Sequence, residues 1–239
     1  MRRTTPNCAA IVEQRDQLLR SLDEVDQEAI IRVLEEFATD GRRARMLSVF
    51  NARLDSVTVL MDAPHDPHNG AAVLRSCDAF GLQRLHVVER SERFLSSRTV
   101  SRGSERWVDV RSYGRSQDAI EALEASGHEL VATHPAGELV PADLRGIPKM
   151  ALVLGNERDG IHEELVRACR RSVRIPMRGF AESLNVSVTA AILLHSATEG
   201  RPGDLTEPER TKLYARGLIL TVPHALEVLE AKGIRVEIP

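Results

Sequence analysis

The apolar residues in the first fifty positions recur with a helical period. The i, i+3, i+4, i+7 spacing is clearest at Ile30, Val33, Leu34 and Phe37. Asp26 is placed to cap this helix, and Gly41 stands where a C′ glycine would end it. A third short helix is predicted over residues 42–51. The pattern therefore predicts a helical extension at residues 1–51.

From Val57 onward, short apolar runs alternate with helical stretches. Strand patterns lie at residues 57–61, 84–88, 107–110, 129–133, 150–154 and 172–175, and helical patterns lie at 71–80, 116–127, 163–171 and 186–199. This alternation predicts an α/β fold with a mainly parallel sheet and helices on both of its faces. Ligands of such sheets bind at the carboxyl ends of the strands.

A break at Pro202 and Gly203 separates this part from a second helical region. Thr206 and Glu209 have the spacing of a capping box at the start of the next helix. The expected organisation is a helical extension at residues 1–51, a main α/β domain at 52–200 and a second helical extension at 201–239.

The composition indicates a globular protein. Of the 239 residues, 42% are hydrophobic and 28% are charged, which argues against a disordered chain. No apolar run approaches the roughly 18–20 residues that span a membrane, and no secretory signal is visible. Cys8, Cys77 and Cys169 are far apart and form no CxxC pair. We therefore expect a cytoplasmic protein without disulfides or a metal site.

Arginines are concentrated in three stretches of a chain whose net charge is only −3. Residues 84–115 hold eight arginines and four acids, residues 167–178 hold five arginines and no acid, and Arg42, Arg43 and Arg45 form the third stretch. Guanidinium groups bind phosphates well, so these stretches are candidates to contact an RNA backbone; the alternative is a solvated, arginine-rich surface. The RNA-contact candidates are Arg42, Arg43, Arg45, Arg84, Arg102 and Arg178. Since only 3% of the residues are aromatic, no base-stacking platform is expected.

The most informative segment is IPMRGFAESLNVS at residues 175–187. It leaves a short strand, crosses a loop that presents Ser183 and Asn185, and enters an apolar helix at Val186. A loop that ends at a helix start exposes backbone N–H groups and can hold polar or anionic ligands. The alternative is an ordinary turn in which Asn185 or Ser187 caps the helix.

Two other loops also follow apolar strands. The first carries Asn69, which can be a helix cap or a ligand group, and Arg75, which needs a partner if it is buried and can form a structural salt bridge. The second reads LGNERDG at residues 154–160. Its GxxxxG spacing lacks the Lys-Ser/Thr of a phosphate-binding loop, and no GxGxxG occurs, so nucleotide triphosphate and dinucleotide enzymes are excluded. Glu157 is either a site carboxylate or a solvated one.

In this order, Asn69 with Arg75, LGNE at 154–157 with Gly160, and IPM at 175–177 with SLN at 183–185 resemble the three motifs of the SpoU/TrmH-type RNA 2′-O-methyltransferases of the SPOUT superfamily. The resemblance covers residues 52–200. The flanking GSERW at 103–107 and the helical extensions are similar to the branch that methylates guanosine 18 in the tRNA D-loop.

The resemblance implies a deep trefoil knot around residues 175–199, a homodimer, and S-adenosylmethionine as the methyl donor. The implied catalytic residues are Asn69, Arg75, Glu157, Ser183 and Asn185. The implied cofactor-binding residues are Thr133, Leu154, Gly155, Ile175, Met177, Ser183 and Leu184.

The resemblance also implies that Arg75 is the group that activates the ribose hydroxyl. Because guanidinium is always protonated, we interpret Arg75 as an electrostatic stabiliser of the developing alkoxide or the adjacent phosphate. Asp66 departs from the family, which usually has a basic residue there. Three alternatives stay open: another tRNA position, 23S rRNA, or a non-catalytic RNA-binding protein on the same fold.

Overall fold

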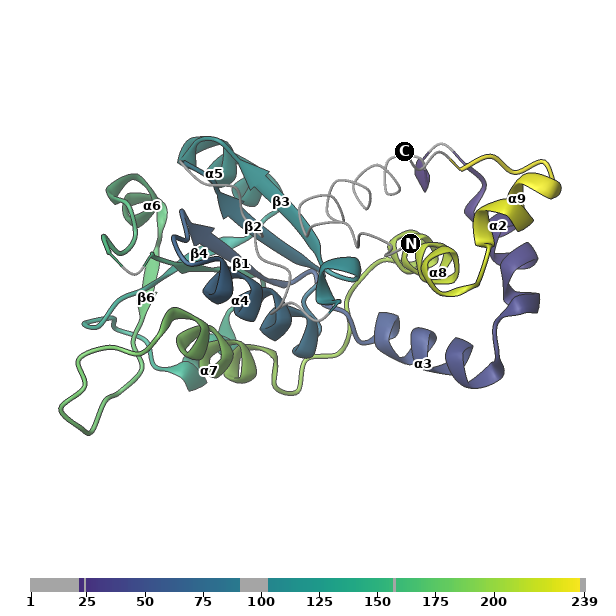
Figure 1. Cartoon of the computed structure of the whole chain (residues 1–239). Helices are drawn as coiled ribbons and strands as arrows, with labels where there is room; N and C mark the ends of the chain where they lie inside the picture. The colour runs from purple at the N-terminus through teal and green to yellow at the C-terminus, as the bar shows by residue number, and fades with distance from the viewer. Residues whose placement is uncertain (1–21, 24, 91–102, 157, 237–239) are drawn as a thin grey trace, which may run out of the picture. The chain divides into compact units, whose positions relative to one another are not determined.

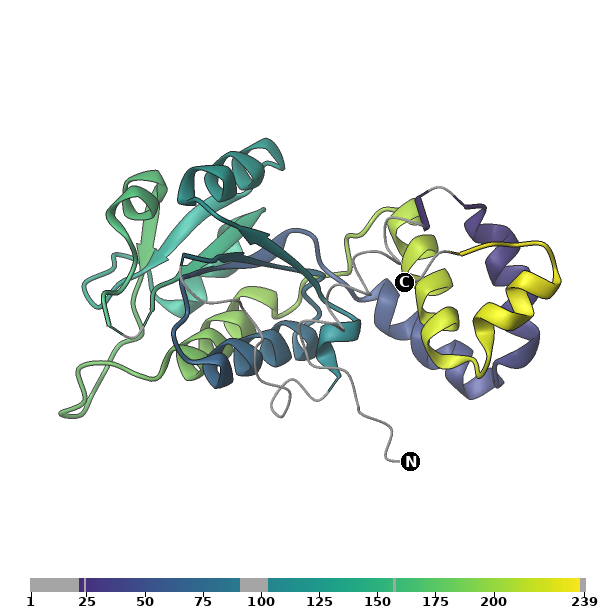
Figure 2. The same ribbon diagram turned by 45° about the horizontal axis from the view of Figure 1, so that its top comes forward.

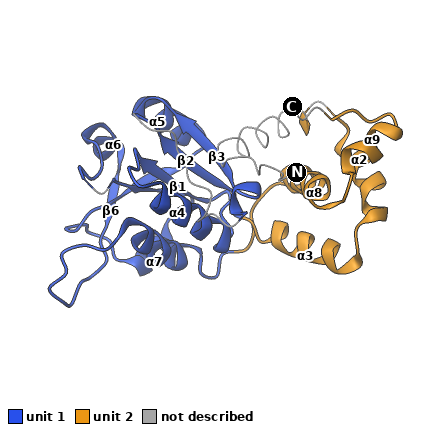
Figure 3. Ribbon diagram, viewed as in Figure 1, with its two compact units in different colours: residues 1–9, 54–201 blue, residues 10–53, 202–239 orange. Residues whose placement is uncertain are grey.

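The computed structural model describes residues 22–23, 25–90, 103–156 and 158–236. The described residues divide into two compact units, one made of Leu54–Arg201 and one made of the residues up to Arg53 together with those from Pro202 (Figure 3). The described parts of the two predicted helical extensions therefore lie in one unit. No helix in the described part of the chain is long and apolar enough to cross a membrane.

The first unit is built on one sheet of six strands in the order β3-β2-β1-β5-β4-β6, in which every neighbouring pair is parallel. The strands are β1 Val57–Asp62, β2 Arg84–Val88, β3 Asp109–Tyr113, β4 Glu129–Thr133, β5 Met150–Leu154 and β6 Arg171–Val173. The predicted parallel α/β sheet is confirmed. Every residue of β1 and β5 is buried, as expected of central strands covered on both faces.

Helices cover both faces of this sheet (Figure 1). Helix α4 (Pro67–Ala79) packs on α7 (Val186–Thr198) on one face, and α5 (Ser116–Ala125) packs on α6 (Glu163–Ala168) on the other. Figure 2 shows the same two layers from another angle. Two 3₁₀ turns, η2 (Ser104–Arg106) and η3 (Pro141–Gly146), complete the unit. The core between the sheet and α5 includes Leu60, Leu123 and Val153.

Several boundaries differ from the sequence prediction. Helix α6 ends at Ala168 instead of residue 171, and β6 runs from Arg171 to Val173 instead of 172–175. Helix α4 begins at Pro67 instead of residue 71, because the Asp66 carboxylate caps it by accepting from the backbone N–H of His68 at 2.8 Å. Strand β3 begins at Asp109 instead of 107, because the N–H groups of Trp107 and Val108 donate to the Ser104 carbonyl and extend the η2 turn.

The second unit is helical. Its elements are α2 Gln27–Leu34, η1 Glu35–Phe37, α3 Asp40–Asn51, α8 Glu207–Thr221 and α9 Ala225–Ala231. Helix α8 packs on α2 and α3, and a Cβ added at Gly217 would lie 2.9 Å from the Met46 sulfur, so glycine permits this close approach. The predicted caps at Asp26 and Thr206 are confirmed.

The prediction that Gly41 ends a helix is wrong. Gly41 lies within the first turn of α3, because the Thr39 hydroxyl accepts from the Arg42 N–H and starts a new helix there. The preceding helix has already ended in the η1 turn at Phe37. The predicted helical stretch before Leu22 lies outside the described residues.

Candidate active site

A cavity of about 510 Å³ opens at the carboxyl ends of β4, β5 and β6. Three segments that are separated from one another in the sequence line it. The lining residues that matter below are Thr133, Gly155, Gly160, Ile161, Ile175, Met177, Ser183, Leu184 and Asn185. Sites for small molecules and cofactors typically occupy about 300–1,000 Å³. The volume therefore suits a ligand of the size of a nucleoside with an amino-acid tail.

The second loop forms one wall of the cavity as a tight turn. The N–H groups of Asn156 and Gly160 each donate to the carbonyl of the other, and Asn156 Oδ1 accepts from the N–H of Arg158 at 2.9 Å and of Asp159 at 2.8 Å. A Cβ at Gly155 would lie 2.4 Å from the Gly160 carbonyl carbon. Only glycine fits at position 155, and bare backbone therefore faces the cavity there. Glu157 lies outside the described residues.

The segment after β4 wraps closely around β6. The His134 N–H donates to the Val173 carbonyl, and the Arg174 N–H donates to the Leu139 carbonyl. A Cβ at Gly137 would lie 2.6 Å from the Val173 carbonyl carbon, so this backbone approach also requires glycine. The Arg174 guanidinium donates to the Gly137 carbonyl and lines the cavity.

The third loop joins the first loop through a pair of asparagines. Asn185 caps α7, since its Oδ1 accepts from the Ser187 N–H at 2.8 Å and from the Ser187 hydroxyl at 2.6 Å. Its Nδ2 is then free to donate to Asn69 Oδ1, at 3.0 Å. The capping role predicted as the alternative is therefore real, and the same side chain also connects α7 to α4. Asn69 is not a cap, because Asp66 performs that role.

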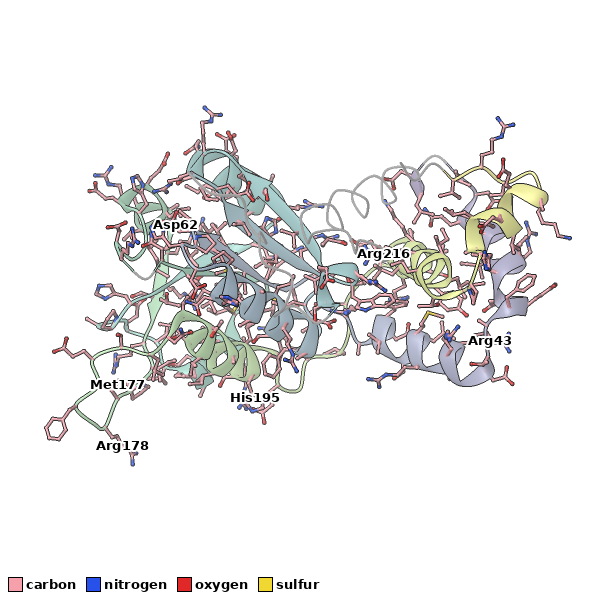
Figure 4. The ribbon with its side chains drawn as sticks, in the orientation of Figure 1. Arg43, Asp62, Met177, Arg178, His195 and Arg216 are labelled. Atoms are coloured by element: carbon pink, nitrogen blue, oxygen red, sulfur yellow. The ribbon has the colours of Figure 1, made fainter. Side chains whose placement is uncertain are left out.

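The predicted cofactor residues are close together. Thr133, Gly155, Ile175, Met177, Ser183 and Leu184 line the cavity, whereas Leu154 is fully buried behind it in β5. Met177 and Arg178 lie on the loop between β6 and α7, which extends away from the sheet (Figure 4). Sequence analysis did not single out Arg174 and Glu182, which also line the cavity; their position beside the third motif was the available signal.

Arg75 is placed differently from the sequence expectation. Its neighbours Leu74 and Cys77 are buried, but Arg75 is exposed on α4 and does not line the cavity. No ion pair or hydrogen bond joins it to another of the described residues, so the alternative of a structural salt bridge is not observed there. Its guanidinium is available to an anionic ligand.

The arginine candidates for RNA contact differ in their surroundings. Arg84 is paired with Asp55, which also binds Lys149 Nζ at 2.5 Å, at the amino ends of the strands and therefore opposite the cavity. Arg84 therefore lies away from the cavity, and an RNA contact at this residue stays a prediction. Arg45 and Arg178 are exposed. On α3, Arg42 donates to the Thr221 carbonyl, and Arg43 pairs with Asp40. Arg102 lies outside the described residues.

The described residues form no metal site at this cavity. Within residues 22–236, apart from the gaps noted above, no group of three His, Cys, Asp or Glu side chains is placed to hold a metal ion. The described residues therefore offer His65 and His68, the two histidines of the first loop, no third ligand for a metal ion.

Comparison with known proteins agrees with the geometry of the site. The profile of the SpoU rRNA Methylase family matches residues 56–195, which include all three loops. A protein of Escherichia coli K12 named tRNA (guanosine(18)-2′-O)-methyltransferase is 33% identical over 205 residues, which cover 81% of this chain and 87% of that protein.

Solved structures give the same result. The A. aeolicus TrmH/SpoU tRNA modifying enzyme superposes with a TM-score of 0.67 at 28% identity, over 80% of this chain and 99% of the other. The SpoU methyltransferase AviRb from Streptomyces viridochromogenes, in complex with the cofactor AdoMet, superposes with a TM-score of 0.54 at 28% identity, over 64% and 63% of the two chains. With the three loops gathered at one end of a parallel sheet, this chain belongs to the SpoU rRNA methylase family.

Proposed function

We propose that this protein transfers a methyl group from S-adenosylmethionine to a ribose 2′-hydroxyl of RNA, and that its target is guanosine 18 in the tRNA D-loop. The observation that carries the proposal is the convergence of the segment after β4, the second loop and the third loop on one cavity, with the Asn69–Asn185 hydrogen bond joining the first loop to the third. The relative from Escherichia coli K12 is named for this activity, and the match covers most of its length.

The cavity fits S-adenosylmethionine. Gly155 and Gly137 permit the close backbone approaches that shape this end of the sheet, and Ile175 and Leu184, which line the cavity, supply apolar walls for a flat base. The residues that we propose to hold the cofactor are Thr133, Leu154, Gly155, Ile175, Met177, Ser183 and Leu184. When bound, the cofactor supplies an electrophilic methyl group on a sulfonium.

The residues of this chain then have to place a ribose hydroxyl in line with that methyl group and stabilise the charge that develops on its oxygen. We assign the charge stabilisation to Arg75, whose guanidinium is exposed and has no ion-pair partner among the described residues. Asn69 and Asn185 fix the start of α4 relative to the start of α7, and thereby the distance from Arg75 to the cavity. Ser183 and Glu157 complete the proposed catalytic set.

The active form that we propose is a homodimer. Val188 and Ile192 stand one turn apart on α7 and are 45% and 37% exposed in the single chain. An i, i+4 apolar pair that is left open on a helix suits a face that packs on a second copy. The family also suggests a trefoil knot, and the close wrapping of residues 134–140 around β6 supports it. We place the enzyme in the cytoplasm, where its free Cys77 and Cys169 would stay reduced.

The domain assignment follows the matched region. We propose that residues 52–200 form the methyltransferase domain and that the extensions at 1–51 and 201–239, whose described parts form one helical unit, contribute tRNA contacts. Arg42, Arg43 and Arg45 on α3 and Arg178 beside the cavity are the proposed contact residues, together with Arg102.

Ribose-methylation mapping tests the target. Total tRNA and rRNA from cells with the gene, without it, and without it but carrying Arg75→Ala are digested and analysed by mass spectrometry. We expect 2′-O-methylguanosine at position 18 of tRNA only in the first sample. A difference at another tRNA position or in 23S rRNA would replace the substrate. No difference, together with no binding of S-adenosylmethionine by the purified protein in calorimetry, would leave a non-catalytic RNA-binding protein.

A further inference from the structure

Asp62, the last residue of β1, carries a carboxylate that is fully buried at the carboxyl edge of the sheet (Figure 4). Its Oδ2 accepts from the backbone N–H of His162 at 2.7 Å, and its Oδ1 lies 2.9 Å from the Arg90 guanidinium. The same guanidinium donates to the Ser116 hydroxyl at 2.8 Å. A buried charge persists only when it is paired, and this one is paired with Arg90 and accepts from His162, which belong to two other segments.

These contacts hold the far end of the second loop. Met61 pairs with Leu154 in the sheet, so the loop leaves β5 at Gly155 next to the end of β1. It returns at His162, where the Asp62 carboxylate holds the backbone. Between these two points lie Gly155, Asn156, Gly160 and Ile161, which line the cavity. The bonds between Asn156 and Gly160 close the turn on itself and do not attach it to the sheet.

The first loop begins at the same residue. Ala63 has a φ of 44°, a left-handed conformation that is unfavourable for alanine, and its N–H donates to the Val88 carbonyl at 2.9 Å. This turn directs the chain toward Pro67 and the start of α4, the helix that carries Asn69 and Arg75. The Asp62 side chain therefore lies where the first and second loops meet.

We propose that Asp62, paired with Arg90, is a positioning residue that fixes the second loop against the first and so sets the shape of the cofactor cavity. This inference rests on the proposed function. The alternative is that this buried ion pair contributes only to stability and has no effect on how the loop contacts the cofactor.

Two substitutions separate these roles. Asp62→Asn keeps the size of the side chain and an acceptor for the His162 N–H but removes the charge opposite Arg90. Arg90→Gln removes the charge from the other partner, whose side chain is 35% exposed, so the protein folds without a new cavity in its core. Asp118→Asn is the matched control, because Asp118 also pairs with an arginine, Arg115, in the same unit but on the surface of α5.

Calorimetric titration with S-adenosylmethionine, steady-state kinetics and amide hydrogen exchange are measured below the melting temperature of each variant. We expect Asp62→Asn and Arg90→Gln to weaken cofactor affinity about tenfold and to raise KM for the cofactor, with KM for tRNA unchanged. The amides of residues 160–162 should exchange faster, even without cofactor. Asp118→Asn should match the wild type in all three measurements.

Two results would overturn the proposal. Variants with lower melting temperatures but wild-type cofactor affinity and amide protection would assign Asp62 a purely structural role. Wild-type protein that fails to bind S-adenosylmethionine would refute the proposed function, and the positioning role with it, and this failure is visible in the first titration before any variant is made.

Discussion

Gly155→Ala is the sharpest single test of the cavity wall. The added Cβ would lie 2.4 Å from the Gly160 carbonyl carbon, 2.6 Å from the Ile161 nitrogen and 2.7 Å from the Gly160 oxygen. Carbon atoms pack at about 3.5–4.0 Å, so the second loop has to open by about 1 Å. All three atoms belong to the backbone, and no side-chain rotation can relieve the overlap.

Both stability and binding should respond to that displacement. Overpacking of this kind costs about 1–3 kcal/mol in unfolding free energy. A wall that moves by about 1 Å misplaces the cofactor, so we expect the affinity for S-adenosylmethionine to fall at least about tenfold and kcat to fall further. Differential scanning fluorimetry gives the first quantity, and calorimetry with single-turnover methylation of tRNA gives the second.

Gly114→Ala is the control, because a Cβ at position 114 would meet no atom within 4 Å and the residue has no positive φ. It should leave both measurements at wild-type values. If Gly155→Ala binds the cofactor as tightly as the wild type does, the turn at 155–160 is not a wall of the cofactor site, and the assignment of the cavity fails.

Three further predictions concern charge and stability. If Arg75 acts through its charge, Arg75→Lys should keep measurable turnover while Arg75→Gln loses it; complete loss in the lysine variant, with cofactor and tRNA still bound, would contradict this. Burial, and then the nearby charge of Arg111, lower the pKa of His86 to about 3, so between about pH 6.5 and 3 the unfolded chain binds a proton that the folded chain does not. Falling pH should therefore reduce the unfolding free energy by about 1.4 kcal/mol per pH unit for this group. In urea unfolding measured at several pH values, the unfolding free energy of His86→Gln should fall less steeply with pH than that of the wild type; an equal pH dependence would count against this. The Arg201 guanidinium donates to the carbonyls of Ala197, Pro148 and Ile147 at 2.7, 2.9 and 2.5 Å, so Arg201→Met should lower the unfolding free energy by about 3 kcal/mol, whereas the exposed Arg115→Met should change it little.

Local sequence patterns predicted a helix or strand correctly where only one pattern was present. The uninterrupted apolar runs of β1 and β5 indicate strands covered on both faces, and the capping box of Thr206 and Glu209 marks the start of α8. The prediction for Gly41 was wrong because two local signals competed there, a glycine that can end a helix and the threonine at position 39 that can begin one. The threonine side chain bonds to the backbone and determines the outcome.

Contacts between distant residues were beyond local rules. The sequence marks Asp62 only as an acid after an apolar strand, which is typical of a solvated strand end. Its burial depends on Arg90, two residues beyond the end of β2, and on the N–H of His162, a hundred positions away. Arg75 shows the reverse case: its apolar neighbours suggested burial, but the helical period turns its side chain to the opposite side of α4.

The strand order explains why loops so distant in sequence form one site. In the order β1-β5-β4-β6, the strand that precedes the first loop lies beside the strand that precedes the second, and β6, which precedes the third, is next but one. Because all of these strands are parallel, their carboxyl ends meet at one edge, and each loop emerges there. The Asn69–Asn185 bond then connects the first loop to the third, and the bond from the His162 N–H to the Asp62 carboxylate connects the second loop to the end of β1. A substitution that breaks either contact leaves the sheet intact, so it should change the site before it changes the fold.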